Sequence, residues 1–534
     1  MSRTKDVPYG AHIVSKITNK CCPCHQSTRL LWNQGVILVL TFIAYMCYHL
    51  TRKPISVVKN VLTANCSNLS PPPNFSVNSS NRDTWCDWAP FDSHDASALL
   101  GTLDSAFLFA YAGAMFLSGF IAERVNLRYF LALGMLTSGI ASYLFGIARS
   151  YNIHSLSYLI LVQTFGGICQ TTGWPGVVTV VGNWFGKGNR GLIFGIWNSH
   201  TSLGNILGTT IAAQYVETDW GLSFIVPGAI MGICGFIIFL FLVPHPENIG
   251  YSTPGPIAYR KIDTPGSSDE SSGGDEEARN SDENVAYRRG WHQQNDFNET
   301  ENLRTETSPM LCINRHNAKN EKPIGFLGAM YIPGVLEYSF SLFFSKLVSY
   351  TFLYWLPLYI AASSNYSASD SANLSILFDI GGIFGAIVAG MLSDYSGMSA
   401  LTCAVMLSFA VPTLFIYDYL GTVSVGVNIL LLLVAGFLVN GPYALITTAV
   451  SAELGTHSSL GNNSKALATV TSIIDGTGSI GAAIGPLLAG LVSSYYGWHN
   501  VFYMLMAADI LSLCLLLRLV YRDIRMLIQR RWTV

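Results

Sequence analysis

Long apolar segments recur along the 534-residue chain, separated by short polar stretches. An α-helix needs about 20 mostly apolar residues to cross a bilayer. The pattern therefore predicts an all-α polytopic membrane protein with twelve transmembrane helices. The predicted spans are residues 33–61, 94–122, 128–148, 154–184, 189–216, 220–243, 334–361, 369–394, 398–417, 426–452, 464–493 and 498–521.

One polar stretch is much longer than the others and lies between the sixth and seventh spans. It contains "SSDESSGGDEEARNSDEN", Ser267 to Asn284. Such an acidic, Ser/Gly-rich tract cannot bury enough apolar surface to fold, which predicts a disordered linker. The predicted parts are a cytosolic N-terminal tail (1–32), a six-helix bundle (33–243) with a lumenal loop at about 62–93, a cytosolic linker with its lead-in (244–333), a second six-helix bundle (334–521) and a cytosolic tail (522–534).

The two sets of six helices repeat each other. "SLGNILGTTIA" in span five matches "SIGAAIGPLLA" in span eleven, so Gly204 corresponds to Gly481 and Gly208 to Gly485, each 277 residues apart (481 − 204, 485 − 208). Glycines four residues apart let two membrane helices approach closely. A role in helix packing and a role in the relative motion of the halves both remain open. Parallel six-helix halves around a central site are similar to the architecture of major facilitator transporters.

Composition and charge support membrane insertion. The chain is 50% hydrophobic and 12% charged, whereas a soluble domain carries about 25% charged residues. A net charge of −2 gives no indication of nucleic-acid binding. Lys and Arg gather in the loops that follow even-numbered spans and in the tails, which predicts that both termini are cytosolic. No cleavable signal peptide is expected, so the first helix would act as its own signal.

The first outer loop carries marks of a lumenal or extracellular face. Four N-x-S patterns occur there, and such patterns are acceptors for N-linked glycans. Two cysteines in the same loop, Cys66 and Cys86, could form a disulfide if the compartment is oxidising. Which acceptor sites are used, and whether the cysteines pair, is left open. The predicted glycosylation sites are Asn65, Asn68, Asn74 and Asn78.

No cofactor, metal or protein partner is expected. "CCPCH" near the N-terminus matches a haem-attachment pattern, but it is one short match on the predicted cytosolic side with no globular domain to enclose a haem. No nucleophile–base or metal-ligand cluster is visible in the sequence, which argues against an enzyme.

Cations interrupt two of the apolar runs. Arg52 and Lys53 lie within span one, and Lys346 lies well inside span seven. A cation at mid-bilayer costs about 2.5–3.5 kcal/mol on insertion scales, so such residues usually face a cavity or a partner. Snorkelling to the surface is the alternative. Because spans one and seven are equivalent in the repeat, Arg52 and Lys346 predict an anion site between the halves, and the planar fork of arginine suits a phosphate.

Polar residues on neighbouring spans could bind the rest of a substrate, although each could equally serve helix packing. Buried acids have three possible roles: partners for the cations, proton relays, or structural hydrogen bonds. The polar candidates are Tyr48 and His49 on span one, Tyr111 on span two, and Asn198 and His200 on span five; the acids are Asp104, Asp379, Asp475 and Glu337.

Long motifs resemble one known group. "YMCYHLTRKPIS", "TGWPGVVTVVGNWFGKGNRGLIFGIWNSHTSLGNILG" and "KLVSYTFLYWLPLY" are similar to the organophosphate:phosphate antiporters, and most similar to solute carrier family 37 in the branch of members one and two. The resemblance implies exchange of a sugar phosphate, with glucose-6-phosphate as the usual substrate, for inorganic phosphate across the endoplasmic reticulum membrane. The implied partners are these two solutes and the lipid bilayer.

The resemblance also suggests site residues. The arginine of the family in span one matches Arg52. Anchored on "WLPLY", the span-seven cation of bacterial relatives falls at Ser349, beside Tyr350 and one turn after Lys346, while their span-five histidine falls at Thr201. Arg52 would bind the phosphoryl group with help from Lys346, and the remaining candidates are Lys53, Tyr48, His49, Tyr111, Asn198, His200, Ser349 and Tyr350.

Other functions stay open at this point. Buried carboxylates would suit a proton-coupled anion symporter, and a membrane-embedded phosphatase or a non-transporting sensor would belong to different classes. A lysosomal or plasma-membrane location is the alternative to the endoplasmic reticulum. The preferred sugar, the affinity, the direction of net flux and the oligomeric state do not follow from the sequence.

Overall fold

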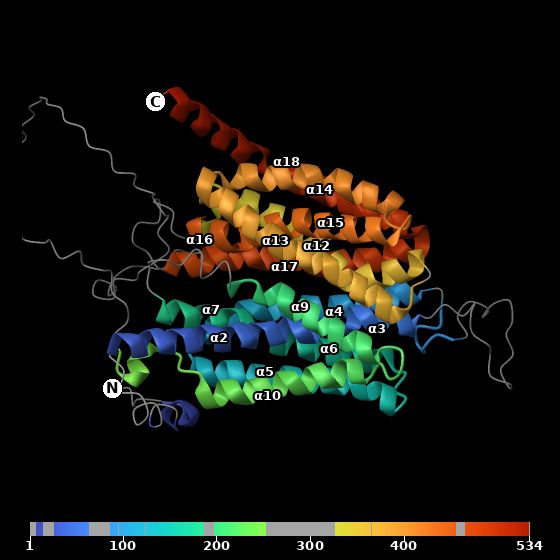
Figure 1. The fold of residues 1–534 in the computed structure, drawn as a ribbon, viewed down its shortest axis with the longest axis horizontal. Coiled ribbons are helices and arrows are strands. Elements are labelled where there is room, and N and C mark those ends of the chain that lie inside the picture. The colour runs from blue at the N-terminus through green and yellow to red at the C-terminus, as the bar shows by residue number, and fades with distance from the viewer. Residues whose placement is uncertain are drawn as a thin grey trace, which may run out of the picture. The chain divides into compact units, whose positions relative to one another are not determined.

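The computed structural model describes residues 7–13, 16, 26–63, 86–93, 95–122, 124–185, 197–251, 326–364, 366–454 and 465–532. Its elements in these ranges are all helices. In Figure 1 the blue-to-green helices of the N-terminal half gather on one side, and the yellow-to-red helices of the C-terminal half gather on the other. The predicted glycosylation sites, Cys66 and most of the predicted linker lie outside the described residues.

The N-terminal half follows the predicted spans, except that spans one and four each consist of two helices. Span one breaks at Lys53 because Pro54 has no N–H to continue the helix, and Pro54 begins the second helix. The helices are α2 (Gln26–Arg52), α3 (Pro54–Leu62), α4 (Ala96–Ala122), α5 (Leu127–Ser150), α6 (Leu156–Gln170), α7 (Gly173–Trp184), α9 (His200–Tyr215) and α10 (Leu222–Phe241), followed by the 3₁₀ turn η2 (Pro246–Ile249).

The C-terminal half has the same order of long helices. Span ten contains one wide π turn, η3 (Ile446–Val450), and such turns occur frequently at functional sites. The helices are α11 (Phe326–Met330), α12 (Val335–Ser363), α13 (Ala368–Ser396), α14 (Ser399–Leu420), α15 (Val425–Leu445), α16 (Ser451–Leu454), α17 (Lys465–Tyr496) and α18 (Trp498–Trp532).

Nine helices in the described part of the chain are long and apolar enough to cross a membrane. Three predicted spans do not meet this criterion. Span 154–184 is divided between α6 and α7, and span 189–216 is described only from residue 197. The third is span 334–361. The last of these is the 29-residue helix α12. Most of its side chains are buried in protein, so α12 can carry serine, tyrosine and lysine where a lipid-facing helix would carry leucine.

The repeat predicted from the glycines is present in the packing. A methyl group at Gly204 would collide with the Met46 carbonyl of α2, and one at Gly481 would collide with the Phe343 carbonyl of α12. One turn further on, Gly208 meets the carbonyl of Leu50 and Gly485 meets that of Leu347. Close helix approach therefore accounts for the glycines, and α2 and α12 correspond with an offset of 297 residues (347 − 50, 343 − 46).

The two halves contact each other through α4 and α17 and through α3 and α12. The hydroxyl of Ser105 on α4 donates to the Ala483 carbonyl of α17 at 3.1 Å. A methyl group at Gly101 would lie 3.1 Å from the Pro486 carbonyl, so glycine is what permits this close crossing. These contacts fix the helices that surround the site described next.

Candidate functional site

A cavity of about 90 Å³ lies between the two halves. Helices of both halves supply its wall, and the wall mixes aromatic rings, amides, hydroxyls and charged groups. Six of the predicted site residues line it: His49, Tyr111 and Asn198 from the N-terminal half, and Lys346, Ser349 and Tyr350 from the C-terminal half. The wall also contains Tyr45, Trp174, Asn205, Asp379, Asn440, Tyr443, Thr447, Thr448 and Asp475.

Three buried lysines each face one aspartate. Lys346 Nζ lies 2.7 Å from Asp475 Oδ1 at the cavity wall. Lys53 Nζ lies 3.6 Å from Asp379 Oδ2. The third pair was not anticipated from the sequence: Lys59 bonds Asp104, and both side chains are fully buried. Of the three roles open to these acids, the structure shows them as partners of cations.

Arg52 differs from the lysines because no carboxylate among the described residues pairs with it. Its Nε donates to Gln170 Oε1 at 2.6 Å, and Nη2, although buried, makes no hydrogen bond within the part of the chain that the structure describes. The guanidinium lies 4.6 Å from the centre of the Tyr111 ring. Arg52 is thus a buried cation whose positive charge is not cancelled by an adjacent acid.

Arg52 does not itself line the main cavity. It lies at the wall of a second, smaller cavity of about 30 Å³, together with Thr51 and Gln170. The connection to the main cavity is Tyr111, which lines the main cavity and also stacks on the guanidinium. The Tyr111 side chain therefore lies between Arg52 and the main cavity.

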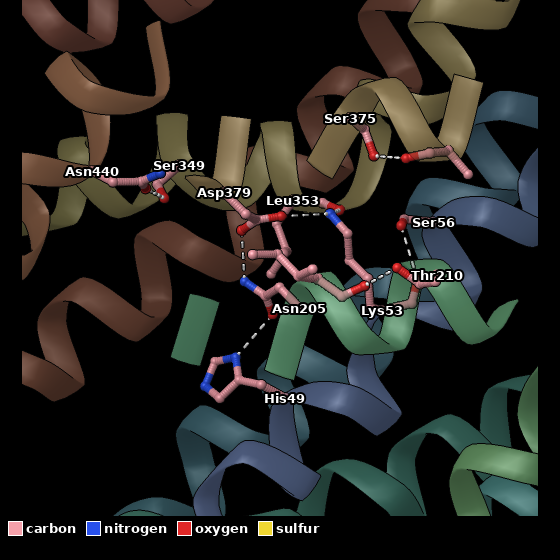
Figure 2. Close-up of polar contacts among 12 residues, drawn as sticks. His49, Lys53, Ser56, Asn205, Thr210, Ser349, Leu353, Ser375, Asp379 and Asn440 are labelled. Carbon is pink, nitrogen blue, oxygen red and sulfur yellow. Dashed lines mark hydrogen bonds and ion pairs between the residues drawn. The ribbon is translucent and has the colours of Figure 1, made fainter. Parts of the chain in front are cut away.

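A chain of polar contacts crosses from one half to the other beside the cavity (Figure 2). His49 Nδ1 lies 3.2 Å from Asn205 Oδ1, and Asn205 Nδ2 donates to Asp379 Oδ1 at 2.9 Å. Asp379 then faces Lys53, which belongs to the N-terminal half. The single acid Asp379 on α13 therefore joins α9 and the junction of α2 with α3 to the C-terminal half.

The lysines of the first span also complete the backbone of α12. Pro357 has no N–H, which leaves the carbonyl four residues earlier without its helical donor. That carbonyl belongs to Leu353, and Lys53 Nζ donates to it at 3.0 Å. Lys59 Nζ donates to the next carbonyl, of Tyr354, also at 3.0 Å. Lys53 of one half thus supplies the donor that Pro357 removes from the Leu353 carbonyl in the other half, and Lys59 adds a hydrogen bond to the neighbouring carbonyl.

Two predicted site residues lie away from the main cavity. The Tyr48 hydroxyl lies 2.7 Å from Thr172 Oγ1 in the core of the N-terminal half. His200 packs among aromatic rings, with the ring of Trp197 at 4.4 Å and that of Tyr45 at 4.7 Å between centroids. Lys53 does not line the cavity either, but it pairs with Asp379, which does.

The helix register relates the charged positions of the two halves. With the offset of 297 residues, Arg52 corresponds to Ser349 and His49 to Lys346. With the offset of 277 between α9 and α17, Asn198 corresponds to Asp475. Position 349, where the resemblance placed a second cation, holds a serine whose hydroxyl donates to Asn440 at 2.5 Å. The two halves therefore present different charges at equivalent places.

Residues that could bind a metal are not grouped: the described ranges contain no cluster of three or more His, Cys, Asp or Glu side chains suited to a metal ion.

Of the two cysteines predicted in the first outer loop, Cys86 lies within the described residues, and it is disulfide-bonded.

Comparison with known proteins defines the class first. The family model of the Major Facilitator Superfamily matches residues 41–469, and the chain belongs to this superfamily. A solved structure of a bacterial homolog of the human lysosomal transporter Spinster, in an inward-facing and unoccupied conformation, has the same fold, with a TM-score of 0.58 and 15% identity over 92% of this chain and 97% of that one.

Full-length relatives then define the family within that class. The chain is 52% identical to the glucose-6-phosphate exchanger SLC37A2 of Bos taurus, over 92% of this chain and 95% of the relative. It is 46% identical to the glucose-6-phosphate exchanger SLC37A1 of Homo sapiens, over 92% and 94% of the two chains. The chain belongs to solute carrier family 37, as its motifs predicted.

Proposed function

We propose that this multi-pass membrane protein is an antiporter that exchanges a sugar phosphate, with glucose-6-phosphate as the expected one, for inorganic phosphate. Relatives that share about half of its sequence along nearly the whole chain are named glucose-6-phosphate exchangers. The single observation that carries the proposal is Arg52, a buried cation with an unpaired Nη2 and no acidic partner among the described residues. A buried charge without a counter-ion is costly, and a phosphate dianion would supply one.

Arg52 would bind the phosphoryl group after a local rearrangement. The Tyr111 ring stacks on its guanidinium and faces the cavity, so this ring has to move aside before an anion in the cavity can reach Arg52. The planar fork of an arginine can then bind two phosphate oxygens. His49, Asn198, Ser349, Tyr350 and Lys346 line the cavity and would contact the rest of the substrate. Lys346, which the resemblance suggests as a helper of Arg52 at the phosphoryl group, already pairs with Asp475.

Exchange, rather than net transport, follows from the same charge. An empty site leaves Arg52 uncompensated when the cavity closes, and either solute removes that penalty. The carrier would therefore change conformation mainly when it is loaded. Fast efflux of phosphate into substrate-free buffer would contradict this mechanism.

The three buried acids have a role in this proposal that does not require proton coupling. Asp104, Asp379 and Asp475 each face a lysine, so each already serves as the partner of a buried cation. Uptake driven by a pH gradient, without internal phosphate, would favour the symporter instead.

The location that we propose is the endoplasmic reticulum membrane, with both termini in the cytosol. Glycosylation at Asn65, Asn68, Asn74 or Asn78 and a Cys66–Cys86 bond would accompany this topology, and glycosidase treatment of the protein from cells tests the former. The lysosomal membrane and the plasma membrane are the places to examine if the protein is absent from the reticulum.

The test of the function uses purified protein in phosphate-loaded liposomes and labelled glucose-6-phosphate. We expect uptake that requires internal phosphate. Arg52→Ala should lower it at least about 30-fold, because truncating one partner of a buried charge pair costs roughly 2–5 kcal/mol. Arg518→Ala is the matched control, since this arginine is 85% exposed and pairs with Glu337 away from the cavity. Uptake without internal phosphate, or release of free phosphate from the ester, would overturn the proposal.

A further inference from the structure

One charged pair in the cavity is not explained by phosphate binding. Lys346 and Asp475 both line the cavity, with Nζ and Oδ1 2.7 Å apart. Opposite charges at this distance largely cancel for a third group, and a carboxylate by itself repels an anion. A site that bound only inorganic phosphate would gain nothing from Asp475.

Asp475 retains the capacity to accept further hydrogen bonds. An ionised carboxylate has about four acceptor positions on its two oxygens, and Lys346 occupies a position on Oδ1. Oδ2 accepts no hydrogen bond from the described residues. The Asp475 side chain is 13% exposed and that of Lys346 is 5% exposed, so the carboxylate is the more accessible member of the pair.

The neighbouring hydroxyls and amides do not use this capacity. Thr447 and Thr448, on the π turn η3, donate to the carbonyls of Tyr443 and Ala444 at 2.8 and 2.7 Å. The Ser349 hydroxyl donates to Asn440. These three hydroxyls are therefore engaged with other acceptors, and Asp475 remains an acceptor at the cavity wall for a group that enters the cavity.

Alcohol hydroxyls are the donors that match such an acceptor. Hydrogen bonds from a hydroxyl to a carboxylate are short and about twice as strong as neutral ones. A sugar phosphate has several alcohol hydroxyls and inorganic phosphate has none. We propose that Asp475, held in place by Lys346, accepts hydrogen bonds from the alcohol hydroxyls of the substrate and thereby distinguishes a polyol phosphate from inorganic phosphate and from esters without hydroxyls. This inference rests on the proposed function and adds the residue that selects the sugar end.

The charge asymmetry of the halves gives the substrate a direction. Asn198 and His49, which correspond to Asp475 and Lys346, place an amide and an imidazole at the equivalent positions of the N-terminal half. That half holds Arg52 instead. The phosphoryl group is thus directed to the N-terminal half and the hydroxyl-bearing carbons to the C-terminal half.

The test compares the affinities of glucose-6-phosphate and propyl phosphate, an ester without hydroxyls, for purified protein, from the ligand dependence of its thermal unfolding. In the wild type we expect glucose-6-phosphate to bind tighter by about 10- to 100-fold, the range for hydrogen bonds to a charged group. In Asp475→Asn the ratio should fall close to one, and inorganic phosphate should bind at least as well as before. Because the ratio is taken within each variant, a general loss of stability does not affect it.

Two further variants complete the test. Asp475→Asn with Lys346→Gln removes both charges, and the ratio should again be close to one. Glu337→Gln is the control: this acid is on α12 but pairs with Arg518 outside the cavity, so the ratio should stay at its wild-type value. A ratio near one in the wild type, or an unchanged ratio in Asp475→Asn, would overturn the inference.

Liposome exchange separates this inference from the function on which it rests. Loss of the proposed function would appear as absent exchange in the wild type, whether or not the ligands bind selectively. Failure of the inference alone would appear as intact wild-type exchange combined with the same ligand preference in Asp475→Asn.

Discussion

The N-terminal and C-terminal halves share a helix order and a glycine packing pattern, but they carry different charges at the cavity. Position 52 is an arginine without an acidic partner among the described residues, while the equivalent position 349 is a serine bonded to Asn440. Positions 346 and 475 form an ion pair, while the equivalent positions 49 and 198 are a histidine and an asparagine. The two halves therefore have similar backbones but different charges. The N-terminal half contributes the cation Arg52, and the C-terminal half contributes the ion pair of Lys346 with Asp475, whose charges cancel and whose carboxylate can accept further hydrogen bonds.

This difference shows how a repeated fold can bind an unsymmetrical solute. Backbone symmetry requires only small residues where helices cross, such as Gly204 and Gly481. Side chains that face the cavity are free to diverge. A phosphate ester has one anionic end and one neutral, hydroxyl-bearing end, and the two halves differ in the same way.

The largest expected effect is on stability, and it comes from removing the lysine of one of two ion pairs. Lys59→Met should lower the free energy of unfolding by about 3–5 kcal/mol, because it leaves the Asp104 charge buried without a partner, and both side chains are 0% exposed. Lys346→Met should cost less, about 1–3 kcal/mol, since Asp475 is 13% exposed at the cavity. Thermal unfolding of detergent-purified protein measures both.

The control for this prediction replaces both members of the fully buried Lys59–Asp104 pair. Lys59→Met with Asp104→Leu should recover much of the lost stability, because apolar residues of similar size often replace a buried ion pair without loss. If Lys59→Met lowered the free energy of unfolding no more than Lys346→Met does, the distinction between the fully buried Lys59–Asp104 pair and the Lys346–Asp475 pair at the cavity would be wrong.

A transfer of the arginine between the halves tests whether its surroundings matter. Arg52→Ser combined with Ser349→Arg keeps the number of cations but should still lower exchange by at least about 30-fold. Tyr111 and Gln170, which contact the guanidinium, lie in the N-terminal half. Exchange of labelled phosphate in liposomes gives the result, and recovery of near wild-type exchange would mean that charge alone, in either half, is sufficient.

The smallest expected effect concerns the glycines that both halves use at their helix crossings. Gly204→Ala and Gly481→Ala should each lower the free energy of unfolding by about 1–3 kcal/mol through overpacking, and by similar amounts, because both methyl groups would meet a backbone carbonyl. Gly113→Ala on α4 is the control: its added methyl has no atom within 4 Å. It should be neutral or slightly stabilising, since alanine is the better helix former. A large difference between the first two variants would contradict equivalent packing.

The sequence predicted the fold well because its signals are local. Apolar runs indicated the helices, and paired glycines indicated the repeat before any contact was known. The break of span one is less visible: the apolar pattern predicts one continuous helix through Pro54, whereas a residue without an N–H can begin a new helix, as Pro54 does here.

The site was predictable in part. Six of the predicted residues line the cavity, but its wall contains further polar residues, such as Asn205, Asn440 and Tyr443, that were not among the predicted site residues. Lys59 is less visible in the sequence because it lies in an apolar stretch, "PISVVKNVL", which forms the separate helix α3 after the break at Lys53. The pairing of each lysine with one aspartate was not predictable, because the partners are far apart in sequence and meet only in the packed helices.

The proline inside α12 links movement of the halves to hydration of this helix. The Leu353 carbonyl, freed by Pro357, receives its hydrogen bond from Lys53 of the opposite half. If the halves separate where α3 meets α12, this carbonyl must take its hydrogen bond from water, because an unsatisfied backbone group is too costly to leave in a membrane. Opening at that end therefore draws water onto α12, and solutes that lower water activity should hold the protein closed there.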